Sequence, residues 1–399
     1  MNIWIINQYA DGPSGQATRD FDRAKILVRN GHSISIFRSS FSQYTLQNND
    51  QQKKESYTQT KESGVKFINI RSFPYKRNNW RRVVNMIGFS WKVYWIGRKF
   101  KESPDVIIGT SVHPVNGLSA QLLSKKKQSR FFFAVTDLWP EILVDMGVIS
   151  KKSLVTFILK RLEKYLYEKA EKIITVLPYA HEYIEGLGIQ NEKIKWISNG
   201  VDLDYFKKME PYQGGDSNNL KIMYIGGHAP HLGLEVILET AKIIQDENLD
   251  QIKFIMIGDG MEKPGLVRKA QELNLKNIEF RNSVPKTDLY KSYEEADGLI
   301  CHFKDVPMLK YGTSMFKIFD YLASGRPIIY GVNGKNNPVK ESQSGFTIKP
   351  ENPAEMSEAI KSLHSMSPAE RKLMGENGPP YVTKHYSMPV LAAKLEEVL

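Results

Sequence analysis

Short apolar runs alternate with helical patterns along nearly the whole chain, and this alternation limits the fold more than any other feature. In the first half the runs are NIWIINQ, HSISIF, DVIIGTS, RFFFAVTD and KIITVLP, and the stretch TRDFDRAKILVRNG between the first two has helical spacing. Strands that alternate with helices in this way build a parallel sheet wrapped by helices. We therefore predict an α/β fold with mostly parallel strands.

The alternation stops once, at KKMEPYQGGDSNNL, which is rich in Pro, Gly, Asn and Ser and has the composition of a linker. It then restarts with KIMYIGG, KFIMIGDG, IEFRNSV, GLICHF, PIIYGV and GFTIKP. We predict two doubly wound, Rossmann-like domains, at 1–205 and 216–380, that face a central cleft. A last helix in 381–399 is expected to return to the first domain. Residues 40–64 are polar and are expected to form an insertion or a mobile loop.

Size and composition agree with two domains inside a cell. A chain of 399 residues exceeds the size at which one hydrophobic core keeps growing. Its one cysteine, Cys301, cannot form an intramolecular disulfide, as is usual in a reducing compartment. The N-terminus lacks the pattern of a signal peptide, and no stretch approaches the roughly 20 apolar residues that span a bilayer. The formal charge of +11 suits nucleic acid, a membrane surface or a phosphorylated ligand.

The segment TSMFKIFDYLASGRPII, residues 313–329, combines the start of a helix with two charged side chains. Phe316 shares one face with the apolar residues that follow it at helical spacing, whereas Lys317 and Asp320 fall on the other. The free N–H groups and positive dipole end of such a helix can bind a diphosphate, with Lys317 as counter-charge. Asp320, one turn deeper, can accept hydrogen bonds from ribose hydroxyls. The alternative is that the two residues form a solvated surface pair.

Glycine-rich turns follow two strands of the second half, YIGG at 224–227 and MIGDG at 256–260. Glycine at such turns lets the backbone approach a ligand closely. Each turn alone is more often just a tight connection between a strand and a helix.

These pieces occur in an order that resembles a known family. The series PSGQATRDFDRAKILVRNGHSISIF, DLWPE, SNGVD, YIGG with LGLEVILETA, FIMIGDG and FKIFDYLASGRPII is similar to family 4 retaining glycosyltransferases of the GT-B fold. Within the family the chain looks most like the O-antigen and capsule branch that includes the fucosamine transferases. The resemblance covers nearly the whole chain. It implies a nucleotide-sugar donor held mainly by the C-terminal domain and an acceptor held mainly by the N-terminal one.

The resemblance also assigns residues to the donor. Asp320 takes the place of the second glutamate of the paired-acid motif, which binds the donor ribose, and Lys317 matches a lysine common in this branch. Gly15 matches the loop that closes on the donor phosphate. The donor site implied in this way comprises Gly15, Gly226, Gly227, His228, Gly258, Asp259, Arg281, Val284, Thr313, Ser314, Met315, Phe316, Lys317 and Asp320, with Arg281 to Val284 near the base.

Three positions depart from the family pattern. The first acid of the pair is Gly312 here, and the two cations that many members place after the YxG strand are Gly227 and Leu232. The positive charge for the diphosphate must therefore come from elsewhere. The candidates are Lys317, Arg326, Lys304 and Lys310, with His228 or His231 as further donors and Asp305 as a replacement carboxylate. For both histidines the alternative is a plain surface role.

Asp137 and His113 are the candidates, with Lys317, for a catalytic role. Asp137 follows a strand of the acceptor domain, close to where many relatives have a histidine near the transferred sugar. There it can orient the acceptor hydroxyl or stabilise positive charge that develops on the sugar. An N-cap for the turn through Trp139 and Pro140 is the alternative. His113 also follows a strand, and a structural histidine is its alternative.

Residues 76–101 contain eight basic residues and no acidic one. One face of the predicted helix is apolar and aromatic, and cations lie off it, as in helices that lie in a membrane interface. The residues expected at the membrane are Trp80, Arg81, Arg82, Trp91, Lys92, Trp95 and Lys99. The alternative is that the apolar face packs on the sheet. Nucleic acid is not expected, since no nucleic-acid-binding motif accompanies the charges.

Together these features predict a cytoplasmic retaining glycosyltransferase of the hexosyltransferase type, peripheral on the inner face of the bacterial plasma membrane. It would move a sugar from a nucleotide-sugar donor, UDP-linked by analogy with the branch, to a polyprenyl-diphosphate-linked saccharide. No cofactor or metal is expected, because no D-x-D motif stands at a strand end; DLD at 202–204 follows a turn. A sugar-nucleotide 2-epimerase of the same fold and a donor-binding scaffold without catalysis are the alternatives.

Overall fold

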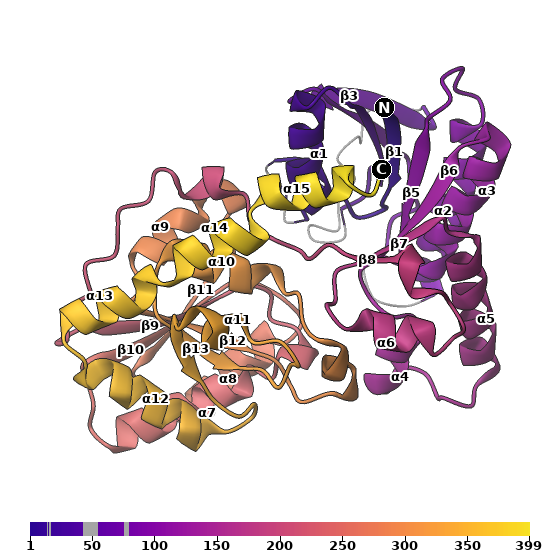
Figure 1. The fold of residues 1–399 in the computed structure, drawn as a ribbon. Coiled ribbons are helices and arrows are strands. Elements are labelled where there is room, and N and C mark those ends of the chain that lie inside the picture. Colours follow the sequence, from indigo (N-terminus) through magenta and orange to yellow (C-terminus); the bar gives the residue numbers. More distant parts are fainter. Residues whose placement is uncertain (14, 16, 43–54, 76–79) are drawn as a thin grey trace. The chain divides into compact units, whose positions relative to one another are not determined.

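A computed structural model describes residues 1–13, 15, 17–42, 55–75 and 80–399 (Figure 1). They divide into two compact units. The first consists of Met1–Ser198 together with Met388–Leu399, and the second of Asn199–Ser387. The division thus falls a few residues before 205, the end that the sequence pattern gives to the first domain.

The first unit is built on an eight-stranded sheet. Its strands are β1 (Asn2–Ile6), β2 (Ser33–Ser39), β3 (Tyr57–Glu62), β4 (Val65–Ile70), β5 (Val106–Thr110), β6 (Arg130–Val135), β7 (Lys172–Thr175) and β8 (Ile194–Trp196). Their order is β3-β4-β2-β1-β5-β6-β7-β8, and each pair is parallel except β3 with β4. In the central strand β1, Ile3, Trp4, Ile5 and Ile6 are all buried, as is usual for a parallel strand covered on both faces.

Helices cover both faces of this sheet. They are α1 (Arg19–Arg29), α2 (Trp80–Gly97), α3 (Pro114–Lys127), α4 (Glu141–Asp145), α5 (Leu154–Lys169), α6 (Ala180–Glu185) and α15 (Met388–Glu396). α1 packs against α15, whereas α3 packs between α2 and α5 (Figure 1). Asn30, after α1, and His32 both bond the carboxylate of Glu396 at the end of α15, at distances of 2.9 to 3.1 Å.

The second unit has a six-stranded parallel sheet in the order β11-β10-β9-β12-β13-β14. Its strands are β9 (Leu220–Ile225), β10 (Ile252–Ile257), β11 (Ile278–Arg281), β12 (Gly298–His302), β13 (Ile328–Gly331) and β14 (Gly345–Thr347). Its helices are α7 (Glu235–Asp246), α8 (Lys263–Glu272), α9 (Leu289–Glu294), α10 (Phe316–Ser324), α11 (Pro338–Ser342), α12 (Pro353–Ser365), α13 (Pro368–Glu376) and α14 (Gly378–Tyr386). Alternate residues of β9 enter two core clusters, one on each face of the sheet.

One prediction about the first unit is wrong. The region 40–64, expected to lack strands, ends in β3, which pairs with β4 in an antiparallel hairpin. Ser63 and Gly64 form the turn, with φ values of 49° and 84°. β3 escaped notice because it is an edge strand with mostly polar side chains, so its hydrophobic signal is weak. Residues 43–54 of the same region lie outside the described residues.

The predicted linker is held by a buried arginine. Arg371 of α13 is fully buried, donates from Nε to the carbonyl of Gly214 (2.6 Å) and donates from Nη2 to the hydroxyl of Ser217 (2.9 Å). Since the guanidinium satisfies otherwise unpaired backbone and hydroxyl groups, this part of the linker belongs to the packed second unit.

A buried carboxyl group joins α5 to α6. Glu163 accepts hydrogen bonds from the hydroxyls of Tyr167 (2.9 Å) and Tyr183 (2.8 Å). Burial raises the pKa of Glu163 to about 8, although the two tyrosine hydroxyls counteract this in part. The group is therefore mostly protonated at neutral pH in the folded protein.

Replacement of Glu163 by Gln should make stability less dependent on pH. An unfolded glutamate ionises near pH 4.3, so the folded wild type binds more protons from about pH 4.3 to 8 and loses stability as the pH rises through this window. We expect Glu163→Gln to gain on the order of 2–4 kcal/mol relative to wild type between about pH 5 and pH 8. Urea unfolding at several pH values measures this, with the exposed Glu168→Gln as control. An offset independent of pH would contradict it.

Candidate active site

The buried lysine of α10 meets a tyrosine of β9 at the carboxyl edge of the second sheet. The Lys317 ammonium donates to the hydroxyl of Tyr224 (2.6 Å) and lies 4.4 Å from the centroid of its ring. The hydroxyl donates in turn to the carbonyl of Gly227 (2.6 Å). Burial lowers the pKa of Lys317 to about 8. Lys317 is thus not the solvated surface residue of the alternative reading. The sequence did not indicate a role for Tyr224 in the site, because a tyrosine in an apolar run looks like any other strand residue.

The two glycine turns predicted in this unit contact each other. Gly226 and Gly258 have φ values of 155° and 147°, and a Cβ on Gly258 would lie 1.9 Å from the carbonyl oxygen of Gly226. Glycine at 258 is therefore required by the packing of the turns themselves. A Cβ on Gly227 would meet only the carbonyl of Asp259, at 4.0 Å. Space for a side chain thus remains where many family members have an arginine.

His228 lies between these turns and is fully buried, so the surface role considered for it is wrong. Neither of its ring nitrogens has a hydrogen-bond partner among the described residues. Burial lowers the pKa of His228 to about 4, and the nearby cations Lys263 and Lys317 add to this effect. The imidazole is therefore neutral. Asp259, in contrast, is exposed, and its carboxylate accepts from the N–H of Gly260 (2.8 Å).

The segment before α10 is fixed by two asparagines. Asn336 accepts from the N–H of Thr313 (2.7 Å) and donates to its carbonyl (3.0 Å). The backbone N–H of Asn199 donates to the hydroxyl of Ser314 (2.9 Å), and its side-chain amide donates to the carbonyl of Ser314 (2.6 Å). No side chain caps α10, whose N-cap residue is Met315. In the first turn the N–H of Ile318 donates to the carbonyl of Met315 (3.3 Å), whereas no side chain caps the N–H groups before it, where a ligand can bind.

Two further residues of α10 differ in their surroundings. Asp320 is half-buried and lies near Tyr293. Burial raises the pKa of the Tyr293 phenol, and the negative charge of Asp320 raises it further. Phe316 is 40% exposed and does not share the buried face of Phe319, contrary to the prediction. It is the first residue of the helix, so its side chain extends beyond the layer that packs on the sheet.

Arg281 and Val284 lie at and after the end of β11. Arg281 pairs with Glu279 and Glu295, both at 2.8 Å, and the hydrogen bonds that it donates to these carboxylates raise its pKa. Val284 is half-buried. Lys263 was not predicted; its ammonium donates to the carbonyls of Gly258 and Arg281, both at 2.9 Å, and so ties the ends of β10 and β11 together.

The other predicted cations lie elsewhere in the second unit. Arg326 is buried after the C-terminal end of α10, donates to the carbonyl of Ser324 (2.7 Å) and stacks over Tyr212. This position is the wrong end of the helix for a phosphate. Lys304 and Lys310 are exposed.

In the first unit, Gly15 lies in a loop that closes on itself. The N–H of Gly15 donates to the carbonyl of Gly12 (3.0 Å), and the N–H of Ala17 donates to the carboxylate of Asp11 (3.0 Å). A Cβ on Gly15 would lie 2.2 Å from the Cβ of Asp11. The loop can therefore form only with glycine at this position.

Asp137 follows β6 and is half-buried. Its carboxylate accepts a long hydrogen bond from the hydroxyl of Thr136 (3.3 Å), and its N–H donates to the hydroxyl of Ser111 (3.3 Å). Burial raises the pKa of Asp137, which Thr136 and Arg19 partly oppose. Its side chain does not cap α4, whose N-cap residue is Pro140. The N-cap alternative is therefore wrong, and the catalytic role stays a prediction.

His113 is buried, and both of its ring nitrogens are engaged. His113 caps α3, because its Nδ1 accepts from the N–H of Asn116 (3.2 Å). Its Nε2 lies 2.6 Å from Oε1 of Gln8. Burial lowers the pKa of His113 to about 3, with a smaller effect from Arg82. These contacts account for His113 as a neutral structural residue, and its catalytic role stays a prediction.

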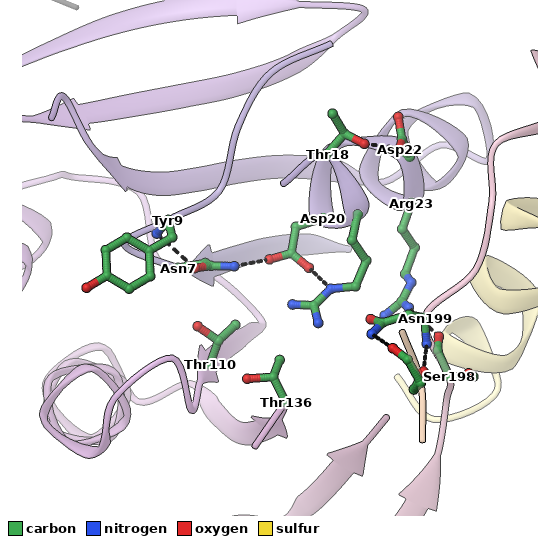
Figure 2. A network of polar contacts seen from close by, with 12 residues as sticks. Asn7, Tyr9, Thr18, Asp20, Asp22, Arg23, Thr110, Thr136, Ser198 and Asn199 are labelled. Atoms are coloured by element: carbon green, nitrogen blue, oxygen red, sulfur yellow. Dashed lines mark hydrogen bonds and ion pairs between the residues drawn. The ribbon is translucent and has the colours of Figure 1, made fainter. Parts of the chain in front are cut away.

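A polar network at the start of α1 was not predicted (Figure 2). Asp20 accepts from the amide of Asn7 (2.6 Å) and from Nε of Arg19 (2.8 Å). Arg23 reaches the carbonyl of Ser198 (3.3 Å). No local pattern in the sequence shows this network, because at the start of α1 charged and apolar residues are buried alike, on all sides of the helix.

The predicted membrane helix exposes an apolar stripe. Trp80 is 66% and Trp91 64% exposed. α2 packs through a different face, so the alternative in which the stripe covers the sheet is wrong. The exposed apolar residues of α2 and of the start of α5, two helices that flank α3, are together called the α2–α5 apolar surface: Trp80, Val83, Val84, Ile87, Trp91, Leu154, Val155, Phe157 and Ile158. Both helices lead into parallel strands, so both begin at the carboxyl edge of the sheet.

The cations predicted on this helix divide into two groups. Arg81 and Lys99 are exposed. Arg82 lies 5.9 Å from the ring centroid of Tyr9, and Lys92 donates to the carbonyl of Arg71 (2.6 Å), so these two make contacts within the unit. Trp95 is half-buried, with the Arg98 guanidinium 3.7 Å from its ring centroid.

Neither a membrane span nor a metal cluster occurs in the part of the chain that the structure describes. No helix there is long and apolar enough to cross a bilayer. No group of three or more His, Cys, Asp and Glu side chains is arranged to hold a metal ion there.

Family models and solved structures agree on one kind of protein. The model for Glycosyltransferase Family 4 matches residues 13–205, and the model for Glycosyl transferases group 1 matches residues 219–366. No curated protein is a detectable sequence relative. Sucrose-phosphate synthase from Thermosynechococcus elongatus is 15% identical, with a TM-score of 0.76 over 100% of this chain and 98% of that chain.

Two further solved structures share this architecture. HepE from Anabaena, in complex with UDP-glucose, is 14% identical, with a TM-score of 0.71 over 100% of this chain and 99% of its own. WaaG, a glycosyltransferase involved in lipopolysaccharide biosynthesis, is 13% identical, with a TM-score of 0.69 over 98% of this chain and 99% of its own. At these identities the likeness establishes the fold, two Rossmann-like domains of the GT-B type. The two glycosyltransferase models, one matching each half of the chain, together with this fold support a GT-B glycosyltransferase of the family 4 type.

Proposed function

We propose that this enzyme transfers a sugar, with retention of configuration, from a UDP-linked donor to a polyprenyl-diphosphate-linked saccharide. The reaction takes place on the cytoplasmic face of the bacterial plasma membrane, in O-antigen or capsule synthesis, as in the branch that includes the fucosamine transferases. It requires no metal. The two units are the acceptor-binding and donor-binding domains, in chain order.

The buried Lys317 beside the uncapped start of α10 carries this proposal. A diphosphate needs positive charge, and a helix N-terminus without a side-chain cap offers N–H groups and a positive dipole end. Lys317 supplies a cation held by Tyr224 at 2.6 Å, in the unit whose turns lack the usual arginine and lysine. The neighbour HepE binds UDP-glucose, which supports uridine as the base.

Other residues then take the following parts. Asp320 accepts from the ribose, and the loop from Arg281 to Val284 lies near the base. Asp137 orients the acceptor hydroxyl or stabilises positive charge on the transferred sugar, while His113 holds Gln8 and α3 in place. The leaving diphosphate is stabilised by α10 and Lys317, so the protein contributes positioning and electrostatics.

The α2–α5 apolar surface supports a membrane-bound acceptor. Exposed tryptophans beside cations are typical of helices that lie in the interface of an anionic bilayer. A surface of this kind brings the first unit to the lipid that would carry the acceptor.

Transfer itself is the first test. We expect nucleoside diphosphate to be released from one of a panel of UDP-, GDP- and dTDP-sugars only when an undecaprenyl-diphosphate-linked saccharide is present in anionic liposomes. Asp320→Asn should raise the donor KM about tenfold, through the loss of a charged hydrogen bond. Asp137→Asn should lower kcat about a hundredfold. The exposed Asp250→Asn serves as control.

The alternatives give different results in this assay. A donor that is epimerised without any acceptor would establish the epimerase. Tight UDP binding without release from any donor would establish the scaffold.

UDP affinity should depend on the charge of Lys317. Because the pKa of Lys317 is about 8, we expect affinity to fall as the pH rises through 8, by up to about tenfold per pH unit. Lys317→Met should abolish this dependence and weaken binding at pH 7. Tyr224→Phe, which removes the hydrogen-bond acceptor of the ammonium, should move the midpoint to lower pH.

Calorimetric titration of UDP between about pH 6.5 and 9.5 measures these effects. Lys304→Met and Lys310→Met are the matched controls. If either of them, rather than Lys317→Met, removes the pH dependence, the diphosphate cation lies elsewhere.

Vesicle binding tests the apolar surface. The double variant Trp80→Glu, Trp91→Glu should bind liposomes containing phosphatidylglycerol at least tenfold more weakly, since two exposed indoles lose their place in the interface. Leu373→Glu, which alters an equally exposed apolar residue of α13, should bind as wild type does. Sedimentation with vesicles measures both. Equal binding of wild type to neutral vesicles would rule out the part given to the cations.

A further inference from the structure

Arg23 of α1 is a buried cation without an adequate partner. Its side chain is only 8% exposed. Among the described residues its buried Nε has no hydrogen-bond partner, and the one hydrogen bond that it forms there, from Nη2 to the carbonyl of Ser198, is long at 3.3 Å. No carboxylate among the described residues forms an ion pair with it. Burying a charge in this way costs free energy unless something pairs with it.

The neighbouring charges compensate Arg23 only in part, because Asp20 acts on it electrostatically but bonds Arg19 instead. Burial would raise the pKa of Asp20, but Arg19, Asn7 and Arg23 together lower it, so the carboxylate is ionised. It bonds Arg19 and Asn7, and therefore neutralises Arg19. Asp137 also acts on Arg19 electrostatically. Burial lowers the pKa of Arg23 to about 10, and the positive charge of the nearby Arg19 lowers it further, as expected for two guanidinium groups close together.

A small cavity adjoins these groups. Its volume is about 30 Å³, the share of one water molecule in the liquid. One part of its wall is polar, with Arg19, Asp20, Arg23, Thr110 and Thr136. The rest is formed by apolar side chains of the strands and by Leu395 of α15. Figure 2 shows Thr110 and Thr136 at the ends of their strands, below Asp20. The cavity is too small for a whole diphosphate, so most of a bound anion would lie outside it, beside its polar wall.

The network also connects with the start of α2, where the α2–α5 apolar surface begins. Asp20 bonds the side-chain amide of Asn7, whose Oδ1 accepts from the N–H of Tyr9 (3.0 Å), and Arg82 of α2 lies 5.9 Å from the ring centroid of Tyr9. The unpaired guanidinium and the apolar surface therefore share one edge of one unit. A ligand that suits both has an anionic head and an apolar tail.

We propose that Arg19 and Arg23 form an oxyanion site that binds the diphosphate of the lipid-linked acceptor. The two guanidinium groups supply the donors that select phosphate oxygens, because the hydroxyls of Thr110 and Thr136 already donate within the protein and the Asp20 carboxylate bonds Arg19. The identity of the acceptor rests on the proposed function, whereas the oxyanion site does not.

Titration of the full-length protein with inorganic pyrophosphate tests the site without any transfer reaction. Saturating UDP is present, so that the donor site is occupied. We expect wild type to bind pyrophosphate, Arg23→Met to bind at least tenfold more weakly, and Arg23→Lys to fall between them. Arg29→Gln removes an exposed cation of the same helix and should change nothing. Equal binding by Arg23→Met, or binding only when UDP is absent, would overturn the site.

Stability measurements separate this role from a structural one. If Arg23 is kept for a ligand, the ligand-free Arg23→Met protein should melt at the same temperature as wild type or higher, because an unpaired buried charge has been removed. A lower melting temperature with unchanged pyrophosphate affinity would show that the arginine only anchors Ser198.

The source of the diphosphate is tested by kinetics. Arg23→Met should raise the KM for the undecaprenyl-linked acceptor at least tenfold and leave the KM for the sugar nucleotide within twofold. A rise in the donor KM alone would assign the site to the donor and overturn the proposal. If no transfer occurs with any substrate, the pyrophosphate titration still decides whether the oxyanion site exists. Vesicles with undecaprenyl diphosphate should bind Arg23→Met more weakly than wild type, whereas vesicles with an equal charge of phosphatidylglycerol should not distinguish them.

Discussion

Parallel pairing of the strands is the constraint on which the rest of this structure depends. In both sheets every strand that leads into a helix ends at the same edge, and each helix returns in the opposite direction. Turns, helix starts and strand ends therefore gather along one edge of each unit. The Lys317 cluster and the Arg23 network each lie on such an edge, and so does the beginning of the α2–α5 apolar surface.

Two buried cations illustrate different ways to accommodate a charge. Lys317 retains a hydrogen bond to a tyrosine hydroxyl at 2.6 Å, and the aromatic ring beneath it adds a favourable cation–π contact. Arg23 has a single long hydrogen bond and an unpartnered Nε. In both cases the folded protein bears a desolvation cost that a bound anion would relieve. Function at these edges is therefore expected to oppose stability.

Sequence patterns predicted the alternation of strands and helices, because buried parallel strands are continuous apolar runs. β3 escaped because an edge strand with polar side chains lacks that signal. The site was predictable where it depends on backbone, as at the glycines of the two turns. It was not predictable where it depends on tertiary packing: no local pattern shows that Tyr224 holds Lys317, that His228 is buried, or that Arg23 turns inward. Phe316 was misplaced because helical spacing says nothing about where the layer beneath a helix ends.

The turns after β9 and β10 bond and pack against each other, so they form one structural unit. The N–H of His228 donates to the carbonyl of Asp259 (2.8 Å), the N–H of Glu262 donates to the carbonyl of His228 (3.1 Å), and Gly258 leaves no room for a side chain beside Gly226. Neither loop can change length or course without displacing the other. If these turns contact the donor as proposed, a change of sugar preference in evolution requires coordinated changes in both loops, and an engineer who exchanges donors must transplant them as a pair.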